Sequence, residues 1–351
     1  MKTGFDLLRS NCKTERDCWL KLWHESPLRE PFAHPAYLEA FLIGNQEAVC
    51  AIQNSTTGAV LLPLIIRRLG WSNSTLEEGY RDATTPYGYG GAYFWGKVDS
   101  EKFWDEFDAW AIENNIVTLF ARLSLFPESV LPFRGKTRYV MDNIVRSLTL
   151  DEESLWMDYE HKVRKNVKKS QRSDVTIEWD LKGERLLEFE SIYTTTMERR
   201  EAADAYFFAN SFFEDLIKGC PDSVAFVHAI KDECVISTEL LLYGELYAYS
   251  FLGGTRYESF DLRPNDLIKH EIIRWCRERG KKFYVLGGGL SPDDGLMRYK
   301  HSFAPKDGRV PFYVGERVFD EHINEALIED RKKSQPLWDP KPEYFPAYRS
   351  S

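Results

Sequence analysis

Apolar positions in the first half of the chain alternate between helical and strand-like spacing. A helix is predicted over Thr14–His24, where Trp19, Leu20 and Trp23 share one face. Turn residues NSTTG separate two apolar runs and predict a hairpin. The further elements predicted in this half are a short helix within 31–42, strands at Ala48–Ile52, Gly58–Ile66 and Gly90–Trp95, a helix at 100–115 and a strand at Val117–Leu123.

The second half begins with helical spacing and then changes to strands. Trp156, Tyr159, Val163 and Val167 are three, four and four residues apart, which predicts one helix with one apolar face, opened by Thr149 and Glu152 as a capping box. Two more helices (Leu186–Arg200, Ala209–Lys218), three meander strands (Val224–Ile230, Val235–Leu242, Leu246–Leu252), a helix from Asn265 to Gly280 and a strand at Phe283–Leu286 follow. Asn265 is the expected cap of that helix and Gly280 its C′ residue.

Both halves show the same order of helices, meander strands, a helix and a final strand. At 351 residues the chain is long for one core, which also favours two domains. The predicted fold class is α+β, with two similar domains, each a mostly antiparallel sheet flanked by helices. The expected boundaries are 1–147 and 148–320, followed by a C-terminal helix and Pro-rich tail at 321–351.

Composition and motifs exclude several kinds of protein. A net charge of −9 argues against general nucleic-acid coating, and we expect no DNA partner, although the charge permits a local basic site. The chain shows no secretory h-region and no apolar window of membrane-spanning length. Its six cysteines are scattered without CxxC or a zinc spacing, so we expect no metal site and reduced thiols in the cytoplasm. HExxH, G-x-S-x-G, Walker A and G-x-G-x-x-G are also absent.

The stretch after the last apolar strand carries the clearest candidate chemistry. Gly287, Gly288 and Gly289 follow Leu286, and a Pro-Asp-Asp-Gly turn then leads into a helical segment with Lys300. Glycine has no Cβ, so its backbone can approach a ligand closely. The alternative is an ordinary strand–turn–helix connection.

A second candidate is the polar face of the helix around 162–172. Its cations are Lys162, Arg164, Lys165, Lys168, Lys169 and Arg172, in an otherwise acidic chain. One interpretation is a solvated helix face. The other is an anion site for a diphosphate or a tRNA backbone. The segment TTPYGYGG at 84–91 is either a phosphate cradle or an aromatic-lined turn; it lacks the Lys and Ser/Thr of a P-loop.

Segments spread over roughly 300 residues resemble the FemABX family within the GNAT-fold N-acyltransferases. The segments are HPAYLEAF (34–41), LLPLIIRR (61–68), TPYGYGG (85–91), RKNVKKSQRSDV (164–175), TTTMERR (194–200), and GGG with LMRYKHSF (287–303). The resemblance implies two tandem GNAT-like domains and transfer of an acyl group to an amine. Characterised members use aminoacyl-tRNA to extend the peptide of a cell-wall peptidoglycan precursor.

The resemblance also implies roles for particular residues. Lys300 matches the lysine that these enzymes place near the reacting carbonyl, and Arg199 resembles an arginine that holds the phosphates of a nucleotide-linked acceptor. Arg164 falls on a commonly basic position, and Tyr247 or Tyr249 falls where a channel tyrosine is expected. Gly287–Gly289 would leave space for an acyl donor or acceptor chain.

Two family features are missing, and they leave the donor open. The coiled-coil arm of some tRNA-dependent members is absent, and so is the Q/R-x-x-G-x-G/A loop that grips CoA pyrophosphate. The first absence permits an aminoacyltransferase without an arm, and the second weakens a CoA donor without excluding it. The donor that the resemblance implies is aminoacyl-tRNA, with acyl-CoA as the alternative and no tightly bound cofactor. The acceptor would be a small-molecule or nucleotide-linked amine. A non-catalytic binding protein on a transferase scaffold is the third hypothesis.

Overall fold

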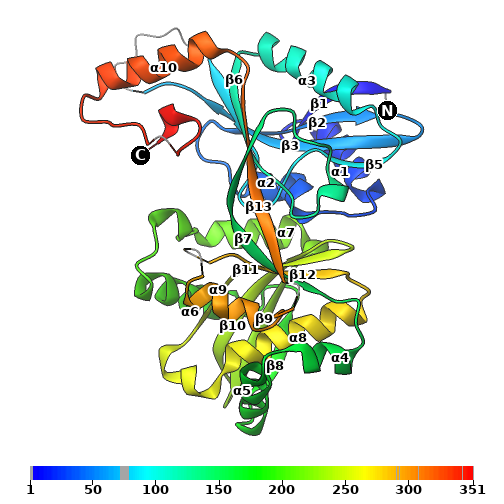
Figure 1. The fold of residues 1–351 in the computed structure, drawn as a ribbon, viewed down its shortest axis with the longest axis vertical. Coiled ribbons are helices and arrows are strands. Elements are labelled where there is room, and N and C mark those ends of the chain that lie inside the picture. Colours follow the sequence, from blue (N-terminus) through cyan, green and yellow to red (C-terminus); the bar gives the residue numbers. More distant parts are fainter. Residues whose placement is uncertain are drawn as a thin grey trace. The chain divides into compact units, whose positions relative to one another are not determined.

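A computed structural model describes residues 3–71, 79–289, 291, 293–306, 308–341 and 343–350. The chain forms two compact units (Figure 1). Unit 1 comprises Met1–Val140 and Phe312–Ser351, and unit 2 comprises Met141–Pro311. The chain therefore passes into unit 2 within strand β7 (Lys136–Ser147) and returns within β13 (Arg309–Val318).

Unit 1 is built on a mostly antiparallel sheet with the strand order β1-β2-β3-β4-β6-β13, and β5 pairs with β3. Its strands, besides β7 and β13, are β1 (Gly4–Arg9), β2 (Glu47–Asn54), β3 (Gly58–Arg68), β4 (Arg81–Thr84), β5 (Tyr93–Gly96) and β6 (Ile116–Arg122). The one parallel pair in this order is β4 with β6. Its helices are α1 (Lys13–Glu25), α2 (Pro35–Glu39), α3 (Ser100–Glu113) and α10 (Glu321–Ser334). Phe103 and Phe107 of α3 pack in one buried cluster with Leu62 and Leu64 of β3.

Unit 2 has the strand order β7-β12-β11-β10-β9-β8. The strands other than β7 are β8 (Thr176–Asp180), β9 (Val224–Lys231), β10 (Cys234–Tyr243), β11 (Tyr247–Thr255) and β12 (Phe283–Gly287). Strands β11 and β12 are parallel and are paired over Tyr247–Tyr249 and Phe283–Val285, whereas the other neighbours are antiparallel. Because β12 continues along β7 while β11 continues along β10, the two parallel strands share only this short ladder.

Helices cover both faces of the unit 2 sheet. Side chains alternate between the two faces along a strand, so neighbouring residues of β9 contact helices on opposite sides. The helices are α4 (Glu152–Asp158), α5 (His161–Arg172), α6 (Leu186–Arg199), α7 (Asn210–Gly219), α8 (Pro264–Glu278) and α9 (Gly295–His301). Ile272 of α8 and Val163 of α5 share a core cluster with Val227 of β9. On the other face, the ring of Phe189 in α6 contacts that of Phe226, 4.9 Å away between centroids.

The predicted α+β class, with sheets flanked by helices, is confirmed. The two units divide the chain differently from the expected boundaries at 147 and 320. Val314–Val318 of β13 pair with Thr118–Arg122 of β6, and this pairing keeps the C-terminal segment in unit 1. Strands β1, β4, β8 and β13 were not predicted from the sequence.

Two helix starts differ from the prediction. Asp151, and not Thr149, caps α4 by accepting a hydrogen bond from the Ser154 amide. Helix α8 begins at Pro264, so that Asn265 lies inside its first turn. Gly280 does follow the end of α8 with φ +72°, as predicted for a C′ glycine.

Candidate active site

Lys300 lies in the last turn of α9, a short helix in unit 2. Asp294 begins this helix by accepting a hydrogen bond from the Met297 amide at 2.7 Å. The half-buried ammonium of Lys300 points back to the end of β12 and donates to the Gly288 carbonyl at 2.6 Å. The predicted glycine run and Lys300 are therefore in direct contact.

The three glycines fit this approach for separate reasons. Gly287 has φ +85°, which a residue with a side chain adopts at a cost, and it lies at a register shift between β12 and β7. A Cβ on Gly288 would lie 2.5 Å from the Met141 sulfur, and one on Gly289 would lie 2.7 Å from an Asp294 carboxylate oxygen. The run thus allows the loop to close against α9. Pro292 of the predicted Pro-Asp-Asp-Gly turn lies outside the described residues.

A buried charged network joins β10, β11, α8 and β12. The ammonium of Lys269 in α8 donates to Glu239 Oε2 at 2.5 Å, to Ser250 Oγ at 2.6 Å and to the Tyr284 hydroxyl at 3.1 Å. Tyr284 in turn donates to the other carboxylate oxygen of Glu239. The Lys269 and Glu239 side chains are 6% and 3% exposed, so their charges stabilise each other away from water. The sequence analysis missed this network.

The surroundings change the proton affinity of Lys300. Its pKa is lowered to about 7, first because burial disfavours the charged amine and then because the Lys269 charge repels it. Glu239 and Asp294 act in the opposite direction. An amine with a pKa near neutrality can hold a proton toward an oxyanion and also release it.

Tyr247 and Tyr249 lie on the strand beside the one that leads to the glycine run. Both side chains are buried, and their backbones pair with Phe283 and Val285 of β12. The Tyr247 and Phe283 rings are 6.0 Å apart between centroids. Both tyrosines are thus close in the sheet to the strand that carries Tyr284, and neither is singled out as the channel residue.

Arg199 and Arg164 contact other parts of unit 2 in the described structure. Arg199 donates to the Thr255 carbonyl at 3.3 Å, and its guanidinium lies 5.0 Å from the centre of the Phe260 ring. Arg164 donates to the Met157 carbonyl at 2.9 Å and to the Tyr159 carbonyl, and so holds the end of α4. No contact of either arginine with Lys300 is found among the described residues.

Asp293 and Asp294, the two carboxylates of the predicted Pro-Asp-Asp-Gly turn, have structural partners. Asp294 is the helix cap already described, and it also accepts from the Ser291 amide at 3.1 Å. Asp293 has φ +54° and pairs with Arg309 at 2.6 Å. These contacts explain both carboxylates as parts of the turn before α9.

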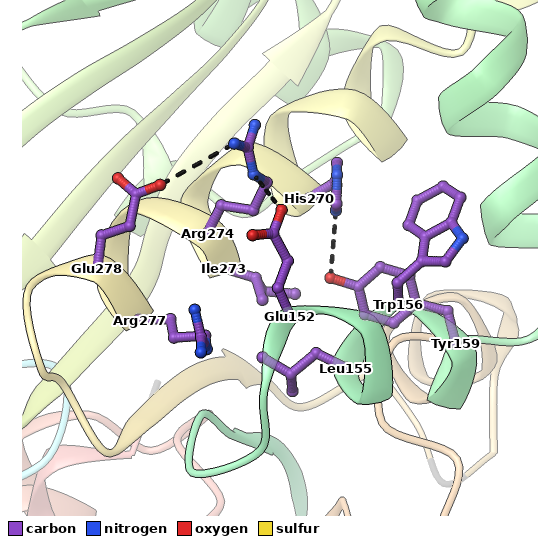
Figure 2. A pocket seen from close by; sticks show the side chains of 9 residues that line it. All are labelled: Glu152, Leu155, Trp156, Tyr159, His270, Ile273, Arg274, Arg277 and Glu278. Atoms are coloured by element: carbon purple, nitrogen blue, oxygen red, sulfur yellow. Dashed lines mark hydrogen bonds and ion pairs between the residues drawn. The ribbon is translucent and has the colours of Figure 1, made fainter.

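A small pocket between α4 and α8 is separate from this network (Figure 2). Its volume of about 10 Å³ has room for about one water molecule. In Figure 2 the Tyr159 hydroxyl points to the His270 ring, 3.4 Å away. Burial lowers the pKa of His270 to about 4, so this imidazole is neutral at pH 7. The pocket is too small for an acyl acceptor.

No group of side chains in the described part of the chain could hold a metal ion. Across the same residues, no helix has the length and apolarity needed to cross a membrane.

A protein-family comparison matches residues 158–301 to the family described as "Acetyltransferase (GNAT) domain". The match runs from the end of α4 to the end of α9 and includes Lys269, Glu239 and Lys300. Unit 2 contains a GNAT-type acyltransferase domain. The predicted enzyme class, an acyltransferase of the GNAT superfamily, is thereby confirmed.

Solved structures extend the similarity beyond this GNAT domain. FemX is 12% identical, with a TM-score of 0.61 over 88% of this chain and 97% of its own. A conserved protein of unknown function from Bacteroides thetaiotaomicron is 9% identical, with a TM-score of 0.56 over 87% and 98% of the two chains. The C-terminal domain of a protein described as a lysylphosphatidylglycerol synthetase from Agrobacterium fabrum is 11% identical, with a TM-score of 0.53 over 91% and 96%. These similarities confirm the predicted FemABX-like fold. A comparison with curated protein sequences gave no match.

Proposed function

We propose that this GNAT-type enzyme transfers an aminoacyl group from aminoacyl-tRNA to a primary amine of a cell-wall or cell-envelope precursor. The observation that carries the proposal is Lys300, held at the end of β12 by the Gly288 carbonyl, with its pKa lowered to about 7. The fold shared with FemX supports the choice of substrate class.

Aminoacyl transfer from an ester needs alignment and charge stabilisation more than covalent help. The acceptor nitrogen forms a bond to the ester carbonyl carbon, and the carbonyl oxygen becomes an oxyanion. Lys300 in its protonated form donates to that oxygen. The carbon–oxygen bond to the tRNA ribose then breaks, and the proton lost by the amine ends on the leaving hydroxyl.

The remaining predicted residues take supporting roles in this proposal. Gly287, Gly288 and Gly289 let the loop backbone close against α9 beside Lys300, and the donor or acceptor chain passes along this backbone. Tyr247 or Tyr249 lines the channel wall, and Arg199 binds the phosphates of a nucleotide-linked acceptor once it leaves the Thr255 carbonyl. Arg164 contributes positive charge near the start of α5. We place the enzyme in the cytoplasm, where its six free cysteines would stay reduced.

An acyl-CoA donor is the second candidate, because the matched family is described as an acetyltransferase. The connection from β11 to α8 argues against it. This connection contains a 3₁₀ helix at Tyr257–Leu262 and no glycine between Thr255 and Pro264. In ordinary GNAT enzymes a Gly-rich loop here lets the pyrophosphate approach the backbone amides at the helix start.

The donors are distinguished by two assays on the same protein. Transfer of a labelled amino acid from aminoacyl-tRNA to a UDP-linked peptidoglycan precursor should be abolished by RNase. Release of free thiol from acyl-CoA should stay at background. RNase-resistant transfer together with thiol release would replace the first proposal with the second.

The role of Lys300 is tested with Lys300→Met, which removes the charge and keeps much of the side-chain volume. We expect turnover to fall by roughly 100-fold, the usual effect of removing one oxyanion donor. Lys218→Met is the matched control, since Lys218 is an exposed lysine of unit 2 paired with Glu214 on α7. Full turnover in Lys300→Met would show that the assignment is wrong.

A further inference from the structure

Helix α5 carries a continuous row of exposed cations. Lys162, Lys165, Lys169 and Arg172 are spaced three, four and three residues apart, so they lie above one another on one side of the helix. The opposite side is buried through Val163, Val167 and Ser170. At a rise of 1.5 Å per residue the row is about 15 Å long. We call these four residues the cation row.

The cation row differs from the charged faces of the other helices in unit 2. On α7 and α8 the cations alternate with acids, as in the Lys218–Glu214 and Arg274–Glu271 pairs. Helix α5 contains no acidic residue, and the described structure gives the cation row no ion pair.

Like charges three and four residues apart on a helix destabilise it. The row is therefore unfavourable for the free protein and becomes favourable when an anion neutralises it. This property separates it from an ordinary solvated face, where acids and bases alternate.

The start of α5 is attached to the helix that carries Lys300. The Glu160 amide, just before α5, donates to the Ser302 carbonyl, just after α9, at 3.0 Å. The Tyr159 and Phe303 rings are 5.6 Å apart between centroids. Farther along α5, Asn166 donates to Asp266 in the first turn of α8 at 3.1 Å. The cation row thus starts beside the end of α9, and its helix is hydrogen-bonded to α8, the helix that carries Lys269 of the buried network.

A groove lies beside the cation row, and its charges indicate that the anion does not enter it. It has a volume of about 490 Å³ and is lined by Trp156, Lys168, Gln171, His270, Glu152 and Glu153. Lys168 lies 5.7 Å from the centre of the Trp156 ring. The two glutamates disfavour phosphate in the groove itself. Helix α5 itself contributes no acid to either side.

We propose that the cation row binds successive backbone phosphates of an RNA, and that this RNA is the donor of the proposed transfer reaction. A row about 15 Å long exceeds what one diphosphate can neutralise. The whole chain, row included, carries a net charge of −9, which limits a polyanion to this local contact. The inference rests on the proposed function for its choice of donor, whereas binding itself can be measured without turnover.

The test is the binding of unfractionated deacylated tRNA to the full chain at several salt concentrations. Four phosphate contacts predict a slope of log Kd against log salt of about 2.8 to 3.6, at 0.7–0.9 per phosphate. Lys165→Gln/Lys169→Gln should lower that slope by about 1.4 to 1.8 and weaken binding roughly 10-fold at low salt. Both positions are exposed on a helix, and glutamine is a good helix former, so the variant should fold.

The matched control is Lys332→Gln/Lys333→Gln, which changes the net charge equally on the exposed side of α10. It should leave both the slope and the affinity unchanged. Lys300→Met should also bind tRNA normally while losing turnover. Excess inorganic pyrophosphate should compete poorly.

The outcomes separate the two proposals. Equal loss of tRNA affinity in both double variants, or no loss in Lys165→Gln/Lys169→Gln, overturns the role of the cation row and leaves the proposed function standing. Absence of tRNA binding by the wild-type chain also overturns it. Thiol release from acyl-CoA in that case would show that the proposed donor is wrong as well.

Discussion

Lys300 lies between opposing charges. Burial and the Lys269 ammonium favour its neutral form, whereas Glu239 and Asp294 favour its protonated form. Because Lys269 and Glu239 are paired, their effects on Lys300 partly cancel, and burial is the first cause of its lowered pKa. The reactivity of this amine is a residue-scale property that can be measured without knowing the acceptor.

The first prediction concerns the pH at which Lys300 becomes reactive. Only a neutral amine reacts with an acylating reagent, so its labelling rate should rise with pH to a midpoint near the pKa of about 7. Competitive labelling with an acetylating reagent, followed by peptide mass spectrometry, measures the midpoint.

The same shift has a consequence for stability. The folded pKa of Lys300 lies below the unfolded value, so between about pH 7 and 10.5 the unfolded chain binds more protons, and Lys300 costs progressively less stability as pH rises. The free energy of unfolding of the wild type, relative to that of Lys300→Met, should therefore increase with pH through this window. Urea titrations at several pH values measure it. A labelling midpoint above pH 9.5 would contradict both expectations.

The second prediction tests the buried Lys269–Glu239 pair. Glu239→Gln leaves the Lys269 charge buried without its counter-charge, so we expect a loss of about 3–5 kcal/mol in the free energy of unfolding. The double variant Lys269→Met/Glu239→Leu removes both charges and should lose much less. Urea denaturation of the two variants gives the comparison.

The labelling midpoint of Lys300 adds a readout that a purely structural pair would not change. Glu239→Gln should move the midpoint down, because a carboxylate that favours the protonated amine is gone. Lys269→Met should move it up, because a repelling charge is gone. Midpoints that stay at the wild-type value in both variants would show that the network does not act on Lys300.

At the scale of elements, the structure explains which predictions succeeded. The unit 2 meander was predicted because apolar runs and tight turns are local signals, and β9, β10 and β11 follow them closely. Gly280 was likewise placed correctly after α8. The helical segment predicted after the Pro-Asp-Asp-Gly turn is α9. The role of Lys300, which the family resemblance implies, stays a prediction.

Other features depend on contacts that local patterns do not contain. The apolar spacing from Trp156 to Val167 fits one helix, but the chain breaks between α4 and α5. At the break, Glu160 donates to the Ser302 carbonyl and Arg164 holds the carbonyls at the end of α4. A tertiary contact has replaced helix continuation. The Lys269–Glu239 pair was missed for the same reason. Each residue is a single charge within an otherwise apolar segment, and neither segment indicates which residue, 30 positions away, is the partner.

The third prediction concerns the start of α9. Asp294→Ala removes the helix cap and should cost about 1 kcal/mol of stability. Turnover should fall roughly 10- to 100-fold, because Lys300 is carried by this short helix and misplacement is costly. Asp294→Asn can still cap, so it should retain both stability and turnover.

Asp320→Ala is the matched control on α10, where Asp320 accepts from the Ile323 amide at 2.9 Å. It should lose similar stability with no loss of turnover, measured by urea denaturation and by the transfer assay. Loss of turnover in Asp294→Asn with normal stability would instead indicate that Asp294 acts as a proton acceptor.

At the scale of the whole molecule, unit 2 is continuous in sequence and unit 1 is not. The C-terminal segment completes unit 1 through several buried contacts. Tyr348 is 1% exposed, and its hydroxyl lies 2.7 Å from Thr118 Oγ1. Arg349 pairs at 2.9 Å with Asp82, whose carboxylate is fully buried. A fragment that ends at residue 147 would lose these partners and the β13 edge of the sheet.

The fourth prediction is that 1–140 joined by a short Gly/Ser linker to 312–351 folds, whereas fragment 1–147 does not. A short linker suffices because the Tyr139 and Tyr313 rings, near the two ends to be joined, are 5.9 Å apart. The joined protein should unfold cooperatively in urea. Fragment 1–147 should bind a hydrophobic dye and show no cooperative transition, since Asp82 would be buried without Arg349 and β6 would expose its edge.

Arg349→Ala in the joined protein should lower its free energy of unfolding by about 3 kcal/mol, because the Asp82 carboxylate would lose one of its two arginine partners. Equal cooperativity of the two fragments would show that residues 1–147 are a complete folding unit and that the C-terminal segment only covers it.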